Sequence, residues 1–564
     1  MTEPACETGR TRWLYLAVIG LGVMLMAGSI PRRGIDPDEL EHLHAGFCVW
    51  RGDVPYRDFF EHHGPGLYYL IWPVFKGLGP ELTVLWVSRG VMLCLSLAAL
   101  YLTYRLSCHV GGERCGLPTV AGLVWMTIFQ AKGMELRPDV PAMLCLLSAL
   151  TWLCQAGDRR TPRAYLSVGF LCGLALLFTQ KSLIPMAGIG LAACAGAGDG
   201  RTVTPTVRVR KAISIAALLG AGAACAWGLA TAGFACAGAA GDFWYSTWYQ
   251  LWIWPVHSSR WDYLRPTLAA DLTIWALALS ECGGVISNWL TRGFRSRLTP
   301  GADGPTSDRT LHVVSHQQVV IAVSVCLASI PFVKATYPQF YFLWLPLLAI
   351  LAGSRYEALL SKLKQRNRVV PMVALALGLA VLQTALWTRT RALGADGALP
   401  HFIQIPGVAW AVLLVIGVTF GAVVMLAWNH RGEYALFAIC GLGMAYGVLR
   451  DFDMALWSNR SQVAAIQAIQ QQVSPQERVF DGFTGLAALR PHAWYYWWIN
   501  EYSLALIPPK TREQRLLEHL QQNPPAALLF DRHLESLPGP VVDWLHEHYA
   551  PVDPIPLWKL KANR

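Results

Sequence analysis

The chain has 564 residues, of which 54% are hydrophobic and only 15% are charged. Soluble domains carry about 25% charged residues, so this shortfall and the long apolar runs between residues 13 and 450 exclude a soluble enzyme, a disordered chain and a disulfide mini-scaffold. The net charge of +10 would suit nucleic acid, but no such motif is present and the bases lie mostly in short loops between apolar runs. We therefore expect an α-helical polytopic membrane protein with no nucleic-acid partner.

The apolar runs predict the membrane spans, since a helix needs about 20 apolar residues to cross a bilayer. The first run, Trp13 to Ile30, lacks a small-residue cleavage site and is expected to be a retained anchor. The run Gly66 to Leu78 contains Pro73 and Lys76 and is expected to be interfacial or re-entrant. About 13 transmembrane helices result, near 13–30, 83–105, 117–131, 138–156, 164–179, 183–198, 212–236, 267–288, 317–333, 339–353, 369–387, 406–428 and 434–450.

Lys and Arg residues orient these spans. Alternate loops are basic, for example those around Arg163 and Lys211, whereas the loops near residues 132, 181 and 334 carry one or two bases each. The positive-inside rule then places the N-terminus in the cytoplasm, and an odd number of spans places the C-terminal region outside.

Two large segments lie outside the spans. The first external loop, residues 31–82, is rich in acids, His and aromatic residues. The tail, residues 451–564, is predicted to be a small α/β domain with an amphipathic helix at Thr511 to Gln521 and a buried strand at Ala526 to Phe530. Its aromatic run, Arg490 to Trp498, is expected either to dock against the first loop or to lie on the membrane surface.

The fourteen cysteines form no CxxC pair and no zinc-like spacing. Most lie inside apolar runs, where Cys behaves as a small hydrophobe. The sequence therefore predicts neither a disulfide framework nor a cysteine metal site.

The first candidate site is the acidic stretch directly after the first span. Pro37 is a suitable start for a helix whose apolar residues would lie on the membrane interface. Asp38 and Glu39 would lie at its N-terminus, which favours ionised carboxylates, and an ionised carboxylate beside hydrocarbon suits a general base. The alternative is a set of solvated acids that follow an anchor.

The second candidate is Glu61-His62-His63, which precedes an aromatic, membrane-dipping piece. Together with His42, His44 and Glu39 these side chains have the donor types of a metal site. The alternative is that they anchor the loop at headgroup depth. We assign no metal here and leave a divalent cation requirement open.

Further candidates follow at later external loops. Arg137 and Asp139 are costly beside hydrocarbon unless paired or functional, and an Arg fork can hold a phosphate. The alternative is a local ion pair of Arg137 with Asp139 or with Glu135. Lys181 is a second candidate phosphate partner or a snorkelling lysine. The aromatic loop from Asp242 to Pro266 is expected to form a lipid-facing belt rather than a sugar-stacking surface.

The order of these elements resembles the GT-C membrane glycosyltransferases, of the protein O-mannosyltransferase and lipid A aminoarabinose transferase type (family 39-like). The family's acidic pair corresponds to Asp38-Glu39, its Arg-Pro-Asp element to Arg137-Pro138-Asp139, and its Thr-Lys element to Thr179-Gln180-Lys181. Its aromatic-Pro span corresponds to the segment from Tyr337 to Pro346, which includes Tyr341.

The family's segment with His or Lys before two prolines corresponds to residues 62–65. The chain departs from the family pattern at three positions. Gly64 replaces a residue that is usually Pro, Gly66 replaces one that is usually Leu or Pro, and Gln180 separates the Thr and Lys of the Thr-Lys element.

The resemblance implies an inverting transfer of a sugar from a polyprenyl-phosphate donor to an acceptor hydroxyl on the periplasmic side of a bacterial inner membrane. Asp38 would be the base, with Glu39 as second choice. Arg137 and Lys181 would bind the donor phosphate. Donor or substrate contacts are also expected from Asp139, Glu61, His62, His63 and Tyr341.

Under this reading, residues 1–450 form a GT-C-like transmembrane catalytic domain and residues 451–564 a periplasmic domain. The lipid-phosphate sugar is the co-substrate, and the acceptor is an envelope lipid, a glycan or a protein. Two other readings stay open, a transporter or flippase and a polymerase or ligase of lipid-linked saccharides. A transporter would carry ionisable groups near the middle of its spans and a repeated half, and a polymerase would have its large external loop late in the chain.

Overall fold

The computed structural model describes residues 5–156, 161–196, 204–253, 260–292, 307–333, 337–365, 458–508, 510–552 and 555–561, together with Cys440, Met444 and Asp451. Most of these residues are helical, and a small sheet lies near the C-terminus. Among them, four helical segments are long and apolar enough to cross a membrane, namely Thr11–Ser29, Thr83–Gly111, Pro205–Cys236 and Val314–Phe332. The fold is thus that of the expected α-helical polytopic membrane protein.

Most of the expected spans between residues 13 and 353 coincide with single helices. These are α1 (Ala5–Ser29), α4 (Thr83–Gly111), α7 (Asp139–Gln155), α8 (Pro162–Phe178), α9 (Leu183–Ala195), α10 (Pro205–Cys236) and α15 (Ser307–Ser329). The expected spans 369–387, 406–428 and 434–450 lie outside the described residues, apart from Cys440 and Met444.

Three expected spans are interrupted. The run 117–131 forms α5 (Glu113–Val124) and α6 (Thr127–Lys132), the run 267–288 forms α13 (Arg260–Ala270) and α14 (Leu272–Arg292), and the run 339–353 forms α16 (Pro338–Phe342) and α17 (Leu345–Gln365). The first two breaks are joined by a hydrogen bond. The buried Asp271, between α13 and α14, accepts from the backbone N–H of Thr127, the first residue of α6, at 3.0 Å. Gln130 donates to the carbonyl of Val124 at 2.6 Å and so satisfies a helix end that lacks a backbone partner.

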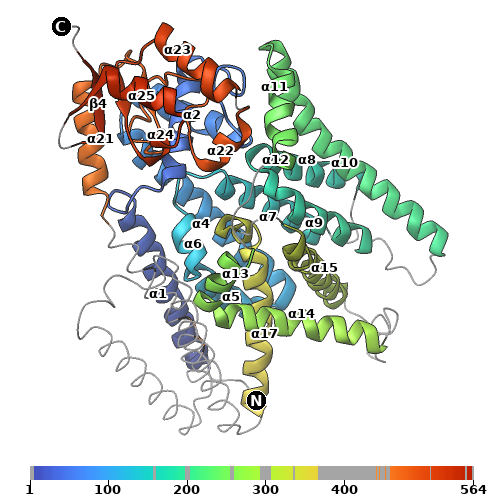
Figure 1. Ribbon diagram of the computed structural model, residues 1–564. Coiled ribbons are helices and arrows are strands. Elements are labelled where there is room, and N and C mark those ends of the chain that lie inside the picture. Colours follow the sequence, from blue (N-terminus) through green and yellow to red (C-terminus); the bar gives the residue numbers. More distant parts are fainter. Residues whose placement is uncertain are drawn as a thin grey trace.

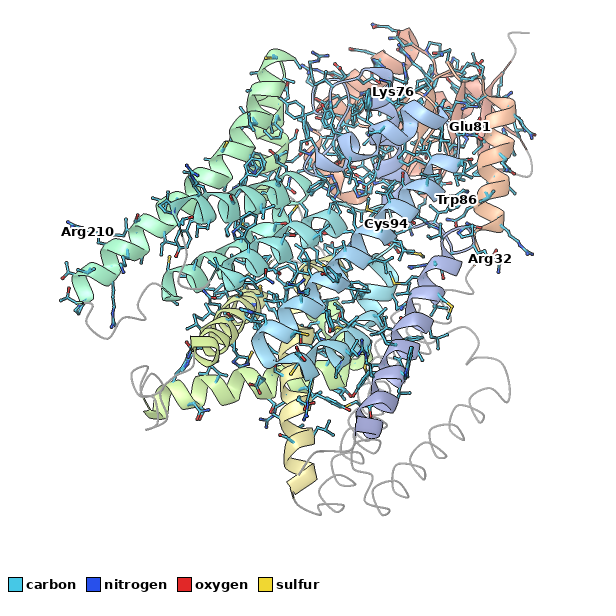
Figure 2. All side chains as sticks on the ribbon, turned by 180° about the vertical axis from the view of Figure 1, so that it is seen from behind. Arg32, Lys76, Glu81, Trp86, Cys94 and Arg210 are labelled. Carbon is cyan, nitrogen blue, oxygen red and sulfur yellow. The ribbon has the colours of Figure 1, made fainter. Side chains whose placement is uncertain are left out.

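Helices α8 and α10 pack closely in the membrane part of the molecule. A Cβ atom at Gly169 would lie 2.1 Å from the backbone oxygen of Leu219, so only glycine allows this approach. The first turns of α10 project away from the C-terminal domain (described residues 458–561), and Arg210 lies at that tip (Figure 2). The short α11 (Ala240–Trp244), the π-helical turn Tyr245–Tyr249 and α12 (Gln250–Ile253) follow at the other end of α10 (Figure 1).

The loop between α1 and α4, which is the first external loop expected from the sequence, forms the two short helices α2 (Pro37–Arg51) and α3 (Gly66–Leu78). A capping box begins α2, with Asp36 accepting from the N–H of Asp38 and Glu39 accepting from the N–H of Asp36. Gly52, in the left-handed conformation, ends it. Residues 39–49 are all buried, so α2 is enclosed by protein rather than lying half exposed on a surface.

The C-terminal region contains a four-stranded sheet of order β1-β2-β4-β3. Its strands are β1 (Val479–Asp481), β2 (Ala527–Leu529), β3 (Tyr549–Val552) and β4 (Leu557–Leu560). Strands β1 and β2 are parallel and the other pairs are antiparallel. The helices around it are α21 (Arg460–Gln472), α22 (Glu501–Leu506), the turn Thr511–Arg515 with α23 (Leu516–Gln522), α24 (Arg532–Glu535) and α25 (Gly539–His548). The expected strand and amphipathic helix correspond to β2 and to the segment 511–522.

The aromatic run of the tail docks against the first external loop, one of the two arrangements expected. The N–H of Phe60 donates to the carbonyl of Tyr495 at 2.9 Å, and the indole of Trp497 donates to the carbonyl of Phe60 at 3.1 Å. The hydroxyl of Tyr495 donates to the carbonyl of Tyr56 at 2.6 Å. Figure 1 shows α2 lying among the helices of the C-terminal domain, and in Figure 2 Lys76 and Glu81 lie toward that domain.

Candidate functional site

Four segments bring the candidate residues to one end of the helix bundle. The start of α2 contributes Asp38, the start of α7 contributes Asp139, and the loop before α3 contributes Glu61. Lys181 lies in a single 3-10 turn, Gln180–Ser182, between α8 and α9. Arg137 lies two residues before the first residue of α7. Its positive charge interacts electrostatically with both Asp38 and Asp139.

Arg137 holds Asp38 in place. Its NH1 donates to Asp38 at 2.8 Å, its NH2 donates to Asp36 at 2.9 Å, and its Nε donates to Glu135 at 2.7 Å. The side chain of Asp38 is 36% exposed, whereas that of Arg137 is 3% exposed. The arginine fork is therefore filled by carboxylates, among them Glu135 as in the alternative expectation, and the side chain of Asp38 stays partly exposed.

The ion pairs continue behind Arg137. Lys132 contacts Asp36 at 3.0 Å and Glu135 at 2.7 Å, and Arg33 contacts Glu135 at 2.7 Å. Burial would raise the pKa of Asp36, but the positive charges of Arg137 and Lys132 outweigh it and hold that pKa far below its usual range. Three acids and three bases thus form one network that fixes the start of α2.

Glu39 is in a different position from its neighbour Asp38. Its carboxylate is fully buried and accepts two hydrogen bonds from Arg89 of α4. It also accepts from the N–H of Leu136 at 2.9 Å and from the N–H of Asp36 at 3.2 Å. Four donors surround this carboxylate, so it joins α2 to α4 and to the loop before α7.

Lys181 faces Asp139 across the site, with 3.4 Å between Nζ and Oδ1. The lysine side chain is 31% exposed and the aspartate 2%, so the ammonium retains access from outside. The inserted Gln180 has a structural part, because its side-chain amide donates to the carbonyls of His62 at 3.1 Å and Thr247 at 3.2 Å. It ties the loop that carries Lys181 to the histidine segment.

Glu61 organises that histidine segment. One of its oxygens accepts from the backbone N–H groups of His62 at 2.8 Å and His63 at 3.1 Å, and lies 3.0 Å from Nδ1 of His63. Nδ1 of His62 lies 3.6 Å from Glu61 and 3.6 Å from Glu41. The ligand atoms of these four residues all lie within 4.8 Å of one another, and their types suit a divalent cation.

The pKa values of the two carboxylates of this cluster shift in opposite directions. Burial would raise the pKa of Glu61, but the hydrogen bond from His63 and the electrostatic interactions with the neighbouring histidines outweigh it and lower that pKa well below its usual range. Burial, together with the charges of Glu61 and Asp38, raises the pKa of Glu41 well above its usual range. The pKa values of the two neighbouring carboxylates are therefore shifted in opposite directions.

The histidines expected to act as one group are divided by the structure. The ring of His42 packs against His63, with centroids 4.8 Å apart. His44 instead faces the C-terminal domain, 3.1 Å from His492. Glu39 is held by Arg89, as described above, rather than by a histidine.

The remaining aromatic candidates lie in apolar surroundings. Tyr341, in α16, is fully buried, and its ring packs against Trp275 at 5.9 Å and Phe340 at 5.4 Å. In the loop after α10, by contrast, Trp244 and Trp252 are exposed, as expected of a lipid-facing belt.

Arg89 is a site residue that the sequence analysis overlooked. A signal for it was present, because an arginine within an apolar span is costly unless it is paired. Lys132 and Arg33 carried no such signal, since bases near the ends of spans are common.

Comparison with known proteins agrees with this architecture. Residues 62–227 match the model of the dolichyl-phosphate-mannose-protein mannosyltransferase family. No protein of curated function matches the whole sequence or part of it.

Solved structures extend the likeness over the whole chain. ArnT from Cupriavidus metallidurans bound to undecaprenyl phosphate superposes with a TM-score of 0.62, at 12% identity and with 97% of each chain covered. The apo form of ArnT gives a TM-score of 0.61, at 13% identity and with 98% of each chain covered. AglB from Archaeoglobus fulgidus, in complex with an inhibitory peptide and a dolichol-phosphate, gives 0.50 at 11% identity, covering 96% of this chain and 72% of that one.

These likenesses confirm the resemblance expected from the sequence. The protein has the GT-C fold of membrane glycosyltransferases, with the architecture of ArnT, and residues 62–227 carry the sequence pattern of the dolichyl-phosphate-mannose-protein mannosyltransferase family.

Proposed function

We propose that the protein is an inverting glycosyltransferase that moves a sugar from a polyprenyl-phosphate donor to an acceptor hydroxyl on the periplasmic face of an inner membrane. The observation that carries this proposal is the presentation of Asp38 by Arg137, with Lys181 across the site on Asp139. The ArnT structure that shares this fold was solved with undecaprenyl phosphate, which supports a lipid-phosphate donor.

Asp38 is the proposed general base. In the transfer, the acceptor oxygen attacks the anomeric carbon, the bond from that carbon to the phosphate oxygen breaks, and the acceptor proton passes to Asp38. Polyprenyl phosphate leaves, and a single displacement inverts the anomeric centre. Asp38 suits this part because its carboxylate is partly exposed and oriented by Arg137, whereas Glu39 is enclosed by four donors.

Lys181 is the proposed partner of the leaving phosphate. Its ammonium is partly exposed and pairs only loosely with Asp139, at 3.4 Å, so an incoming phosphate can replace that contact. Charge-assisted contacts to a leaving phosphate act where negative charge develops. His62 and His63 lie in the segment that Gln180 joins to the loop of Lys181. Glu61 fixes their backbone by accepting from both N–H groups. Arg137 then has a positioning part, since its three nitrogen atoms are used by acids.

The acceptor class is proposed to be a component of the cell envelope, whether lipid, glycan or protein. The C-terminal domain contacts the loop that carries Glu61 and His62 through Phe60. It thus lies beside the site and is placed to contact an acceptor that approaches from outside.

The test uses full-length protein in membrane vesicles with a panel of radiolabelled polyprenyl-phosphate sugars, and measures release of polyprenyl phosphate and label transfer. Asp38→Asn should lower turnover by about 10²- to 10⁴-fold, as expected for loss of a general base, while donor binding is retained. The matched control Glu81→Gln changes an exposed acid of the same loop and should keep full activity. Unchanged turnover in Asp38→Asn would remove the base assignment. Movement of labelled lipid across the vesicle membrane without cleavage of the sugar–phosphate bond would favour a flippase.

A further inference from the structure

A second cluster of metal-ligating side chains lies at the contact between α2 and the C-terminal domain, away from the carboxylates of the proposed site. His44 and Cys48 occupy positions i and i+4 of α2, so they share one face of the helix. His492, in the segment after β1, meets them from the C-terminal domain. Cys48 and His492 are 444 residues apart in the sequence.

The three donor atoms converge on one point. Nε2 of His44 lies 3.1 Å from Nδ1 of His492, and Sγ of Cys48 lies 3.4 Å from the first nitrogen and 3.6 Å from the second. Around a tetrahedral ion with nitrogen and sulfur bonds near 2.0 to 2.3 Å, neighbouring ligands are about 3.3 to 3.6 Å apart. The side chains therefore already stand at the separations that zinc requires.

The ring of His44 is held with a lone pair toward the other two side chains. Nδ1 of His44 lies 2.9 Å from the carbonyl of Ala488 and donates its proton there, which leaves Nε2 as an acceptor. Nδ1 of His492 faces this lone pair at 3.1 Å, so the two ring nitrogens stand where they can act as neighbouring ligands of one cation. Bonding of the outer nitrogen to a backbone carbonyl is also typical of histidines that bind metal.

The surroundings suit a structural ion. Cys48 and His44 are buried, and Trp497 packs over the ring of His44 with centroids 4.0 Å apart. His492 is only partly buried, which leaves one direction open for a fourth ligand such as water.

We propose that His44, Cys48 and His492 bind one Zn²⁺ ion that clamps the C-terminal domain onto α2. The thiol of Cys48 loses its proton to solvent when the ion binds, and no oxidation is involved. The sequence analysis expected no cysteine metal site because it considered spacing along the chain, whereas this site joins two distant segments. The proposal does not depend on the glycosyl transfer chemistry.

The first experiment measures metal content. Full-length protein, purified in detergent, should contain about one zinc ion per chain at this site. In Cys48→Ala the amount of zinc at this site should fall at least fivefold. The matched control Cys94→Ala changes an exposed cysteine of α4 and should retain the ion. Equal zinc in the wild type and in Cys48→Ala would overturn the proposal.

The second experiment separates this site from the Glu41, Glu61, His62 and His63 cluster, which has no sulfur donor. Protein stripped of metal and reloaded with Co²⁺ should show a sulfur-to-cobalt charge-transfer band that Glu61→Gln retains and Cys48→Ala loses. Absence of the band in the wild type would overturn the proposal.

If Cys48→Ala does not fold, the wild-type chain provides the same test. Its Cys48 should be protected from a thiol reagent when Zn²⁺ is present and should react at least tenfold faster after chelation. A reaction rate that chelation leaves unchanged would contradict zinc ligation.

Discussion

Arg89 of α4 donates two hydrogen bonds to the carboxylate of Glu39, one residue after Asp38, and both side chains are fully buried. The pair fixes how α2 sits on the membrane part, and it therefore sets the direction in which Asp38 points. Arg89 also donates to the carbonyl of Ile30 at 2.8 Å, so the end of α1 is held by the same guanidinium.

We expect Arg89→Met to destabilise the protein by about 3–5 kcal/mol, because it leaves a buried carboxylate without its counter-charge. Thermal unfolding in detergent measures this loss. The double variant Arg89→Met with Glu39→Met should recover most of the stability, since it removes both buried charges together. A double variant as unstable as the single one would contradict this account of the pair.

We expect Lys181→Gln to weaken use of the donor by about 10- to 100-fold, corresponding to roughly 1.5–3 kcal/mol for a hydrogen bond to a charged group. The effect should appear mainly in KM for the polyprenyl-phosphate sugar, and Lys181→Arg should restore part of it. Steady-state kinetics in vesicles provide the measurement. Lys76→Gln is the control, because that lysine lies over the ring of Trp72 at the surface of α3. An unchanged KM in Lys181→Gln would exclude the lysine from donor binding.

We expect Gly64→Ala to reduce both stability and activity. A Cβ atom there would lie 2.2 Å from the backbone oxygen of Leu177, and relieving such a clash typically costs about 1–3 kcal/mol. The shift would move the histidine segment away from the loop of Lys181. Gly77→Ala, in α3, meets nothing within 4 Å and should be neutral or stabilising by about 0.5–1 kcal/mol. Melting temperatures and turnover of the two variants, compared side by side, decide the matter, and equal behaviour would argue against a tight contact at Gly64.

We expect the stability of the C-terminal domain to fall as the pH rises toward neutrality. Burial raises the pKa of Asp481 from 3.8 to about 7, despite the hydrogen bonds from Thr484 that oppose the rise. Because the folded state holds the proton more tightly than the unfolded state, this contribution is complete below about pH 4 and is lost as the pH rises through about 7.

Asp481→Asn should flatten this dependence, and each pKa unit corresponds to about 1.4 kcal/mol. Hydrogen exchange of β1 as a function of pH is the measurement. The exposed Asp543→Asn serves as control and should leave the profile as in the wild type. A wild-type profile that does not decline over this range would show that Asp481 is ionised throughout.

The sequence predicted the helices well where an apolar run alone decides the structure, as in α4 and α10. It did not predict the breaks near Trp125 and Asp271, because these are joined by a hydrogen bond between Asp271 and Thr127, which are 144 residues apart. No local pattern encodes such a pairing.

The candidate site was foreseen as a set of residues but not as a set of contacts. Asp38 and Glu39 look equivalent in the sequence, and only the position of Arg89 separates the enclosed carboxylate from the presented one. Arg137 was expected either to hold a phosphate or to pair locally with Asp139 or Glu135, and in the structure its three nitrogen atoms contact Glu135, Asp38 and Asp36.

The contacts of Phe60 with Tyr495 and Trp497 have a consequence for biosynthesis. The loop that carries Glu61 is made early, yet the residues that hold it emerge only when most of the polypeptide has been translated. A chain cut short by a premature stop codon between residues 451 and 494 would keep all of its long apolar runs, but its first loop would lack the two residues that hold Phe60.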